Sequence, residues 1–249
     1  MKPTRLQLGA SRLEYLQPAI REQFAQPEWM HLGEPLFSER PVDKGIAYIL
    51  RHYSMSYIVR RGLLRLFRRD ADAIAAKVDL DDIYARTTFE SWHYRHGDQL
   101  PFTDMMFNYI FSEHFFEHLF LDEAVDLLRE CRRVLTPGGV IRICVPDADL
   151  RTYGPPEPLG YPDRRMSFSH PTKHKTRWNV YALCEALRMA GLRPIPLIYC
   201  DRDGRYCEHD LEDLRLDYSG CKDPEVVFNM NHVYRKKSLI VDGIVSNRI

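Results

Sequence analysis

Two glutamate–histidine pairs lie close together near the middle of the chain. Ser112-Glu113-His114 contains the first pair, and Glu117-His118 contains the second about one helical turn later. An imidazole changes its protonation state near neutral pH, so a histidine can take a proton from a reacting hydroxyl group. Each histidine also has a structural interpretation. His118 could pack against or cap the start of a helix, and His114, beside two phenylalanines, could be a satisfied core residue.

A second group of polar side chains lies in residues 151–178. A loop rich in proline (Pro155, Pro156, Pro158 and Pro162) comes first, and a stretch rich in His, Lys and Arg follows at Ser169–Trp178. Five side chains of this segment could hold a sugar or an anionic group: Tyr153, His170, Lys173, His174 and Arg177. The same composition is also typical of an ordinary solvated loop.

The histidines and cysteines do not predict a metal site. The chain has ten histidines and six cysteines, but no group of them shows the close ligand spacing of a structural zinc site. Cys200, Cys207 and His209 come nearest to such a pattern. The six cysteines contain no C-x-x-C pair and do not form a disulfide framework at this length, so we expect a reducing, cytoplasmic location.

The elements that position the glutamate–histidine pairs can be predicted from hydrophobic periodicity. Phe107–Phe111 is a short, nearly continuous apolar run, which is typical of a strand buried on both faces. Asp122–Leu135 carries one apolar helical stripe: Ala124, Leu128, Cys131 and Leu135. We expect Pro137-Gly138-Gly139 to end this helix and Val140–Val145 to form the next strand. This order predicts a βαβ unit with a parallel sheet.

Further strands are predicted towards both ends of the chain. Thr4–Leu8 and Trp29–Leu32 indicate two strands before the βαβ unit. A helix from about Asn179 to Ala190 follows it. Ile195–Cys200 and Ser238–Val245 then indicate a final antiparallel pair, separated by a long excursion over residues 201–237.

Residues 35–92 have the texture of a helical insertion. Val59, Leu63 and Leu66 recur at i, i+4 and i+7, and a basic stripe faces them: Arg61, Arg65 and Arg68. Basic amphipathic helices can bind membrane surfaces or acidic partners. The alternative is a solvated face balanced by the nearby acids Asp79, Asp81 and Asp82.

The amino-acid composition excludes some classes of protein. The 249 residues include 35 Lys and Arg against 35 Asp and Glu, with 45% hydrophobic and 12% aromatic residues. These values are typical of a globular protein. The zero net charge argues against a dedicated nucleic-acid binder. We expect a soluble, unexported chain, because it has neither an apolar run of about 18 residues nor an N-terminal signal core.

The block Leu100–Asp147 resembles the class I S-adenosylmethionine-dependent methyltransferases. More narrowly, it is similar to predicted methyltransferases associated with polysaccharide or glycan biosynthesis. Leu-Pro-Phe-x-Asp at 100–104 and Arg-Val-Leu-x-Pro-Gly-Gly at 133–139, each leading into a strand, carry the resemblance. The resemblance implies an α/β, Rossmann-like fold. Its sheet would have seven strands, mostly parallel with an antiparallel last strand, and helices on both faces. The chain would be one domain, 1–249, with the helical insertion at 35–92 and an acceptor lid at 151–178.

The resemblance also implies S-adenosyl-L-methionine as the cofactor. Leu8, Gly9 and Ala10 would form the turn at its methionine part, although only one glycine of the usual glycine-rich turn is present. Glu34 would accept the ribose hydroxyls, and Asp98-Gln99 would meet the adenine. Ser112-Glu113 would lie at the corner that faces the methyl group. An ordinary strand-ending turn at Gly9 and a turn aspartate at Asp98 are the structural alternatives.

The same resemblance implies in-line methyl transfer, and we expect O-methylation of a sugar or glycan precursor. His114, His118 and His174 are the candidate bases, with Asp147 as an orienting group or alternative base. The expected partner is a small-molecule or glycan acceptor. Because the chain has local basic patches, this acceptor could be anionic. A catalytically weak or inactive protein of the same fold, acting as a binding or assembly module, is the second hypothesis. A nicotinamide-dependent dehydrogenase is disfavoured because Gly-x-Gly-x-x-Gly does not follow the first strand.

Overall fold

The fold is described from a computed structural model that covers residues 2–10, 24, 26–33, 55, 88–150, 174–229 and 238–246. Glu34, the stripe at 59–68 and the greater part of the predicted lid lie outside the described residues. Within these ranges, no helix combines the length and the apolar character needed to cross a membrane.

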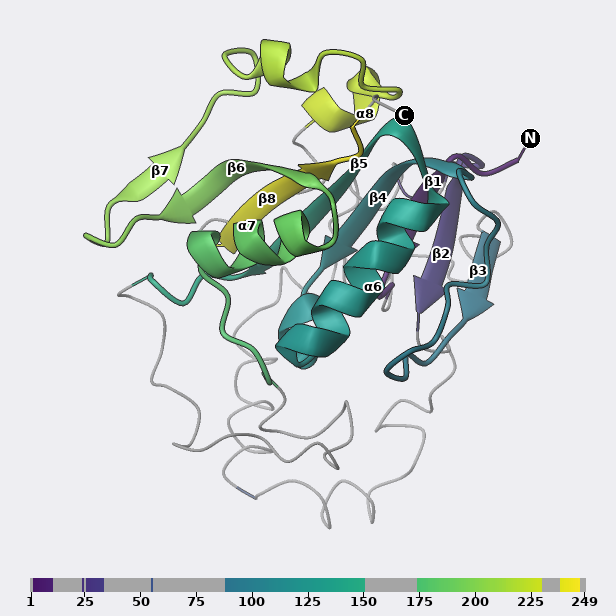
Figure 1. The fold of residues 1–249 in the computed structure, drawn as a ribbon, viewed down its shortest axis with the longest axis horizontal. Helices are drawn as coiled ribbons and strands as arrows, with labels where there is room; N and C mark the ends of the chain where they lie inside the picture. Colours follow the sequence, from purple (N-terminus) through teal and green to yellow (C-terminus); the bar gives the residue numbers. More distant parts are fainter. Residues whose placement is uncertain are drawn as a thin grey trace.

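An eight-stranded sheet forms the centre of the part of the chain that the structure describes (Figure 1). Its order is β3-β2-β1-β4-β5-β8-β6-β7. The five strands from β3 to β5 run parallel to their neighbours, whereas β8 is antiparallel to both β5 and β6, and β7 is antiparallel to β6. The strands are β1 (Arg5–Leu8), β2 (Trp29–Gly33), β3 (Thr88–Ser91), β4 (Phe107–Glu113), β5 (Leu135–Pro146), β6 (Arg193–Cys200), β7 (Tyr206–Glu208) and β8 (Ser238–Ile244).

This architecture confirms the predicted Rossmann-like α/β class and the antiparallel last strand, but the expected count of seven strands is wrong. β7 is a three-residue edge strand inside the predicted excursion. β3 occupies the end of the range expected to be a helical insertion. Both strands are short and largely exposed, so neither has the apolar alternation by which a strand is recognised in a sequence.

The helices α6 and α7 cover one face of the sheet (Figure 1). In α6 (Leu121–Val134), the predicted residues Ala124, Leu128 and Cys131 are fully buried. The helix ends before Leu135, which begins β5, so Pro137-Gly138-Gly139 lies inside that strand and does not end the helix. In α7 (Val180–Met189), the Asn179 side chain caps the first turn by accepting a hydrogen bond from the Ala182 amide at 2.9 Å.

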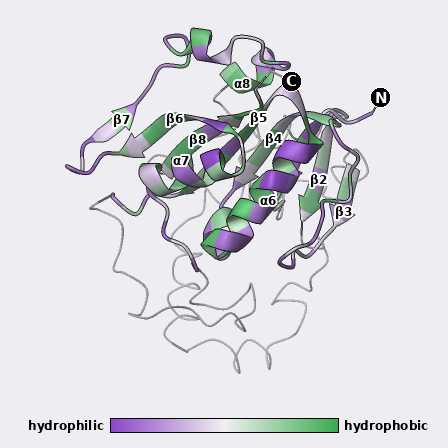
Figure 2. Ribbon diagram, in the orientation of Figure 1, coloured by the Kyte–Doolittle hydropathy of each residue, from purple (hydrophilic) through white to green (hydrophobic). Residues whose placement is uncertain are grey.

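Short helices cover the opposite face. Tyr218 of the 3₁₀ helix η3 (Arg215–Tyr218) and Val226 and Val227 of α8 (Pro224–Phe228) join a second hydrophobic cluster with β4 and β5. Figure 2 shows hydrophobic residues along the central strands and a mixture of hydrophilic and hydrophobic residues along α6. The sheet therefore carries a core on each face, as the predicted placement of helices on both faces requires.

A fully buried ion pair joins β5 to β8. Arg142 donates two hydrogen bonds to Asp242, one to each carboxylate oxygen, both at 2.7 Å. Both side chains have no exposed surface. Arg142 also donates to the Val227 carbonyl, and the Tyr218 hydroxyl donates to Asp242. Burial disfavours the guanidinium charge, but the adjacent carboxylate outweighs this effect and raises the pKa of Arg142.

Removing one partner of this pair should be strongly destabilising. Asp242→Ala leaves an uncompensated buried guanidinium, and we expect the free energy of unfolding to fall by about 3–5 kcal/mol. Urea denaturation followed by circular dichroism measures the change. Glu212→Ala is the control, because it breaks an exposed ion pair with Arg215 and should cost at most about 1 kcal/mol. An equal fall in the free energy of unfolding of the two variants would contradict the stabilising role of the buried ion pair.

His31 is a buried neutral histidine on β2. It has no exposed surface, and its ring nitrogens lie 2.6 Å from Gln7 Oε1 and 2.9 Å from the Phe24 carbonyl oxygen. Burial lowers the pKa of His31 from 6.5 to about 4, even though the hydrogen bond to Phe24 acts in the opposite direction. The folded protein therefore keeps this side chain neutral over a pH range in which the unfolded chain is protonated.

The free energy of unfolding should therefore fall as the pH drops from about 6.5 to about 4. Over this range the unfolded state binds a proton at His31 that the folded state excludes, which amounts to a loss of about 3 kcal/mol. Urea denaturation at several pH values measures the loss. His31→Gln should remove this contribution, whereas His93→Gln, at an exposed position, should retain it. An identical pH profile in the His31 variant would contradict the prediction.

Candidate functional site

The candidate site lies where the strand order reverses. β1 pairs in parallel with β2 on one side and with β4 on the other, and Leu8 is in register with both Leu32 and Ser112. The residues that follow these strands therefore meet at one edge of the sheet. In open α/β sheets, ligands bind outside the carboxyl ends of the strands at such a switch point.

The turn after β1 is compact and depends on glycine. Gly9 has a φ of +74°, and a Cβ atom there would lie 2.5 Å from the Phe115 ring. The Gly9 and Ala10 amides both donate to the Leu32 carbonyl, at 2.9 and 3.0 Å. Leu8 is fully buried in the core, so only its main chain is available to a ligand. Two of the donors that a ligand could use in this turn therefore bind β2 instead.

Two buried polar atoms near this turn have no hydrogen-bond partner within the described ranges. They are Oγ of Ser112, whose residue is fully buried, and Nε2 of His114. A buried polar atom without a partner is costly. Each is therefore a place where a ligand could supply the missing hydrogen bond.

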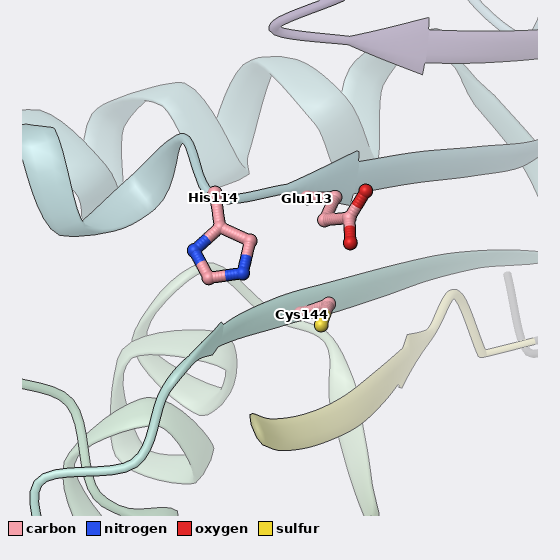
Figure 3. A group of neighbouring side chains, drawn as sticks. All are labelled: Glu113, His114 and Cys144. Carbon is pink, nitrogen blue, oxygen red and sulfur yellow. The ribbon is translucent and has the colours of Figure 1, made fainter. Parts of the chain in front are cut away.

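His114 stands at a strained corner after β4. Its φ of +51° is uncommon for a residue other than glycine. The His114 amide donates to the Cys144 carbonyl at 2.9 Å, and Nδ1 lies 3.0 Å from Glu117 Oε1. Figure 3 shows the imidazole turned towards the side on which Cys144 of β5 lies, with Glu113 beside it. One main-chain contact and one side-chain contact thus hold His114 in a backbone conformation that is unfavourable for residues other than glycine.

The structure brings the three predicted histidines to one carboxylate, that of Glu117. Glu117 and His118 belong to the 3₁₀ helix η2 (Phe116–His118). The His118 and His174 rings are 5.2 Å apart in an edge-to-face arrangement. The Lys175 and Thr176 amides donate to the Glu117 carbonyl, which ties His174 to this helix. Glu117 is not among the site residues predicted from the sequence. The pattern in the sequence that points to it is the glutamate that immediately precedes each of the two histidines, His114 and His118.

Asp147 is held by the main chain on both sides. It is 1% exposed, and its carboxylate accepts hydrogen bonds from the Cys200 amide at 2.7 Å and the Asp149 amide at 3.0 Å. Burial raises the pKa of Asp147, although these hydrogen bonds act against the rise. The carboxylate therefore ties the end of β5 to the end of β6. Its predicted catalytic role stays a prediction.

The predicted adenine turn is well formed. The Asp98 carboxylate accepts a hydrogen bond from the Arg95 amide at 2.9 Å, as the structural alternative for a turn aspartate requires. Gln99 is exposed. The loop is fastened along α6, because Tyr94 donates to the Glu123 carbonyl and the Leu100 amide donates to Glu130. The turn is thus ordered by the fold, and Glu34, its predicted companion, lies outside the described residues.

Cys200, Cys207 and His209 do not form a metal-binding cluster in the structure. Within the described ranges, two other groups have ligand atoms within 4.8 Å of one another: Glu113 with His114 and Cys144, and Glu117 with His118 and His174. Cys200 is buried in β6, and the His209 ring stacks on Tyr199 at 5.8 Å.

Comparison with known protein families finds a match over part of the chain. Residues 62–143, about a third of the chain, match the model of a methyltransferase domain. No curated protein matches the sequence. The domain match confirms the predicted methyltransferase and supports S-adenosyl-L-methionine as its cofactor.

Several solved structures are similar in fold. A chain from the complex of the Haloferax volcanii Trm112 methyltransferase activator has 17% identity and a TM-score of 0.46, with 98% of this chain and 84% of that chain covered. A SAM-dependent methyltransferase from Archaeoglobus fulgidus has 14% identity and a TM-score of 0.44, with 98% and 86% covered. One from Aquifex aeolicus has 13% identity and a TM-score of 0.44, with 98% and 84% covered.

Asp147→Asn should destabilise the fold. An asparagine side chain has only one acceptor oxygen, so the Cys200 or Asp149 amide would lose its partner, at a cost of about 1–3 kcal/mol. Denaturant unfolding at pH 7 measures the change. Asp203→Asn, at an exposed turn position, should leave the free energy of unfolding unchanged within about 0.5 kcal/mol. A stable Asp147→Asn protein would contradict the structural role.

Proposed function

We propose that the protein transfers a methyl group from S-adenosyl-L-methionine to a hydroxyl group of a sugar or glycan precursor. The methyltransferase domain match over residues 62–143 is the observation that carries the reaction type. The parallel strands β1, β2, β4 and β5, with their switch point between β1 and β4, support it. The acceptor class rests on the resemblance of Leu100–Asp147 to methyltransferases associated with glycan biosynthesis.

The residues at the switch point fit the cofactor. Ser112 Oγ and His114 Nε2 are buried polar atoms without partners in the described part of the chain, and Ser112 is in register with the end of β1. The methionine part of the cofactor has polar groups that would satisfy Ser112 Oγ, and the acceptor hydroxyl would satisfy His114 Nε2. We assign the adenine to the Asp98 turn and the ribose to Glu34. When bound, the cofactor supplies an activated methyl group.

Alignment of the acceptor is the main task left to the protein. Holding two reactants in line can contribute about 7–11 kcal/mol to lowering a barrier. We assign His114 as the group that holds the acceptor hydroxyl and takes its proton. It is the histidine at the corner after β4, and Glu117 fixes its ring through Nδ1. His118, His174 and Asp147 are the other candidates.

The predicted acceptor lid meets this corner through its last residues. Of the side chains expected to hold the acceptor, the structure describes His174 and Arg177. Arg177 is exposed, whereas the neighbouring Lys175 lies 3.7 Å from Glu123 and over the Phe120 ring. Among the described residues of the lid, we therefore assign Arg177 as the cation that binds an anionic acceptor, such as a phosphate-linked sugar.

One observation favours the second hypothesis, a binding module that retains the fold without turnover. The Phe115 ring occupies the space beside Gly9, where the family fold places the methionine part of the cofactor. In that case Phe115→Ala should bind S-adenosylhomocysteine and the unaltered protein should not. Calorimetric titration of both proteins decides between the two functions.

We expect the unaltered protein to bind S-adenosylhomocysteine in isothermal titration calorimetry. Ser112→Ala removes one hydrogen-bonding group and should weaken binding by about 1 kcal/mol, roughly fivefold in Kd. Ser219→Ala, at an exposed position, is the matched control and should bind normally. No binding up to millimolar ligand would refute the proposed function. Unchanged affinity in Ser112→Ala would refute the assigned contact.

A further inference from the structure

We propose that Glu117, His118 and His174 form a binding site for a divalent transition-metal ion of the zinc class. One carboxylate oxygen and one ring nitrogen from each histidine lie within 4.8 Å of one another. Ligand atoms about 2.0–2.2 Å from a shared tetrahedral ion are about 3.3–3.6 Å apart. Small side-chain rotations therefore bring the three groups onto one ion.

The burial of Glu117 is the first argument for a cation. The residue is 2% exposed, and its Oε2 atom has no hydrogen-bond partner in the described ranges. A buried carboxylate oxygen that faces no donor is costly, and such groups are normally paired or coordinate a metal. A bound cation between Glu117 and the two imidazoles satisfies this oxygen.

The second argument is that the surrounding structure already orients the ligands. His114 Nδ1 lies 3.0 Å from Oε1, the other oxygen of the Glu117 carboxylate, so this carboxylate has the outer hydrogen bond that metal-binding carboxylates usually have. The Glu117 carbonyl accepts hydrogen bonds from the Lys175 and Thr176 amides, which holds the segment of His174 against η2. The Thr176 hydroxyl adds a bond to the Leu119 carbonyl at 2.7 Å.

The donor set selects the class of ion. Two imidazoles and one carboxylate form the His₂Glu set of many catalytic zinc sites, which leave a fourth position for water or a ligand. Imidazole disfavours Mg²⁺ and Ca²⁺, which prefer oxygen ligands. The fourth position could accept a hydroxyl or an anionic oxygen. If His118 and His174 hold an ion, they do not act as bases, and His114 alone of the three histidines can do so.

The competing cluster of Glu113, His114 and Cys144 is the less suitable one. Cys144 is fully buried, and its thiol would have to lose a proton to bind a metal. Substitution of Cys144 separates this alternative from the proposed site.

Titration of the full, chelator-treated protein with Zn²⁺ tests the proposal, with Co²⁺ as a spectroscopic probe. We expect one ion per chain, a visible Co²⁺ spectrum typical of tetrahedral coordination, and a higher unfolding temperature with Zn²⁺. Glu117→Gln and His174→Asn should each weaken Zn²⁺ binding at least about tenfold, because even outer-shell changes cost about 10–100-fold. His96→Asn, at an exposed histidine, and Cys144→Ser should bind normally.

Three results would overturn the proposal. The first is no Zn²⁺ binding by the unaltered protein at 1:1 stoichiometry. The second is unchanged affinity in both Glu117→Gln and His174→Asn. The third is loss of binding in Cys144→Ser with retention in Glu117→Gln. His174→Asn changes a half-buried residue, so it keeps the test decisive if Glu117→Gln does not fold. The titration contains no methyl donor, so its outcome is independent of the proposed function.

Discussion

The buried pair of Arg142 and Asp242 is the interaction on which the rest of the sheet depends. The two residues face each other in the antiparallel register of β5 and β8. A shift by one residue would turn Asp242 to the opposite face of the sheet and leave two buried charges without partners. Tyr218 and the Val227 carbonyl complete the network. This one contact therefore fixes β8 between β5 and β6 and anchors the short helices over that face.

The position of β5 in turn determines the corner at His114. The Cys144 carbonyl of β5 accepts the His114 amide, and Asp147, just past the same strand, holds the Cys200 amide of β6. A histidine at φ +51° is retained only when surrounding contacts outweigh the backbone preference. The contact with Glu117 supplies one, and the main-chain bond to β5 supplies another. The corner at His114 is thus a consequence of sheet register.

Much of the fold could be predicted from local patterns, whereas the site could be predicted only in outline. The apolar run at 107–111 and the stripe of Ala124, Leu128 and Cys131 locate β4 and α6, because burial imposes periods that are visible in the sequence. The ion pair of Arg142 and Asp242 joins residues that are 100 positions apart in the sequence, so no local periodicity predicts it. The same holds for the meeting of His118 and His174, which depends on main-chain hydrogen bonds at residues 175 and 176.

The turn after β1 has few glycines, and the groups that could bind a ligand lie instead at the end of β4. The Gly9 and Ala10 amides are both used by the Leu32 carbonyl, so this turn joins β1 to β2 and offers a ligand few donors. Three buried polar atoms without a hydrogen-bond partner in the described chain lie instead at and just after the end of β4: Ser112 Oγ, His114 Nε2 and Glu117 Oε2. Ligand recognition at this switch point should therefore depend more on the corner after β4 than on the turn after β1. A chain organised in this way can retain the sheet order of the fold and still bind its ligands through different contacts.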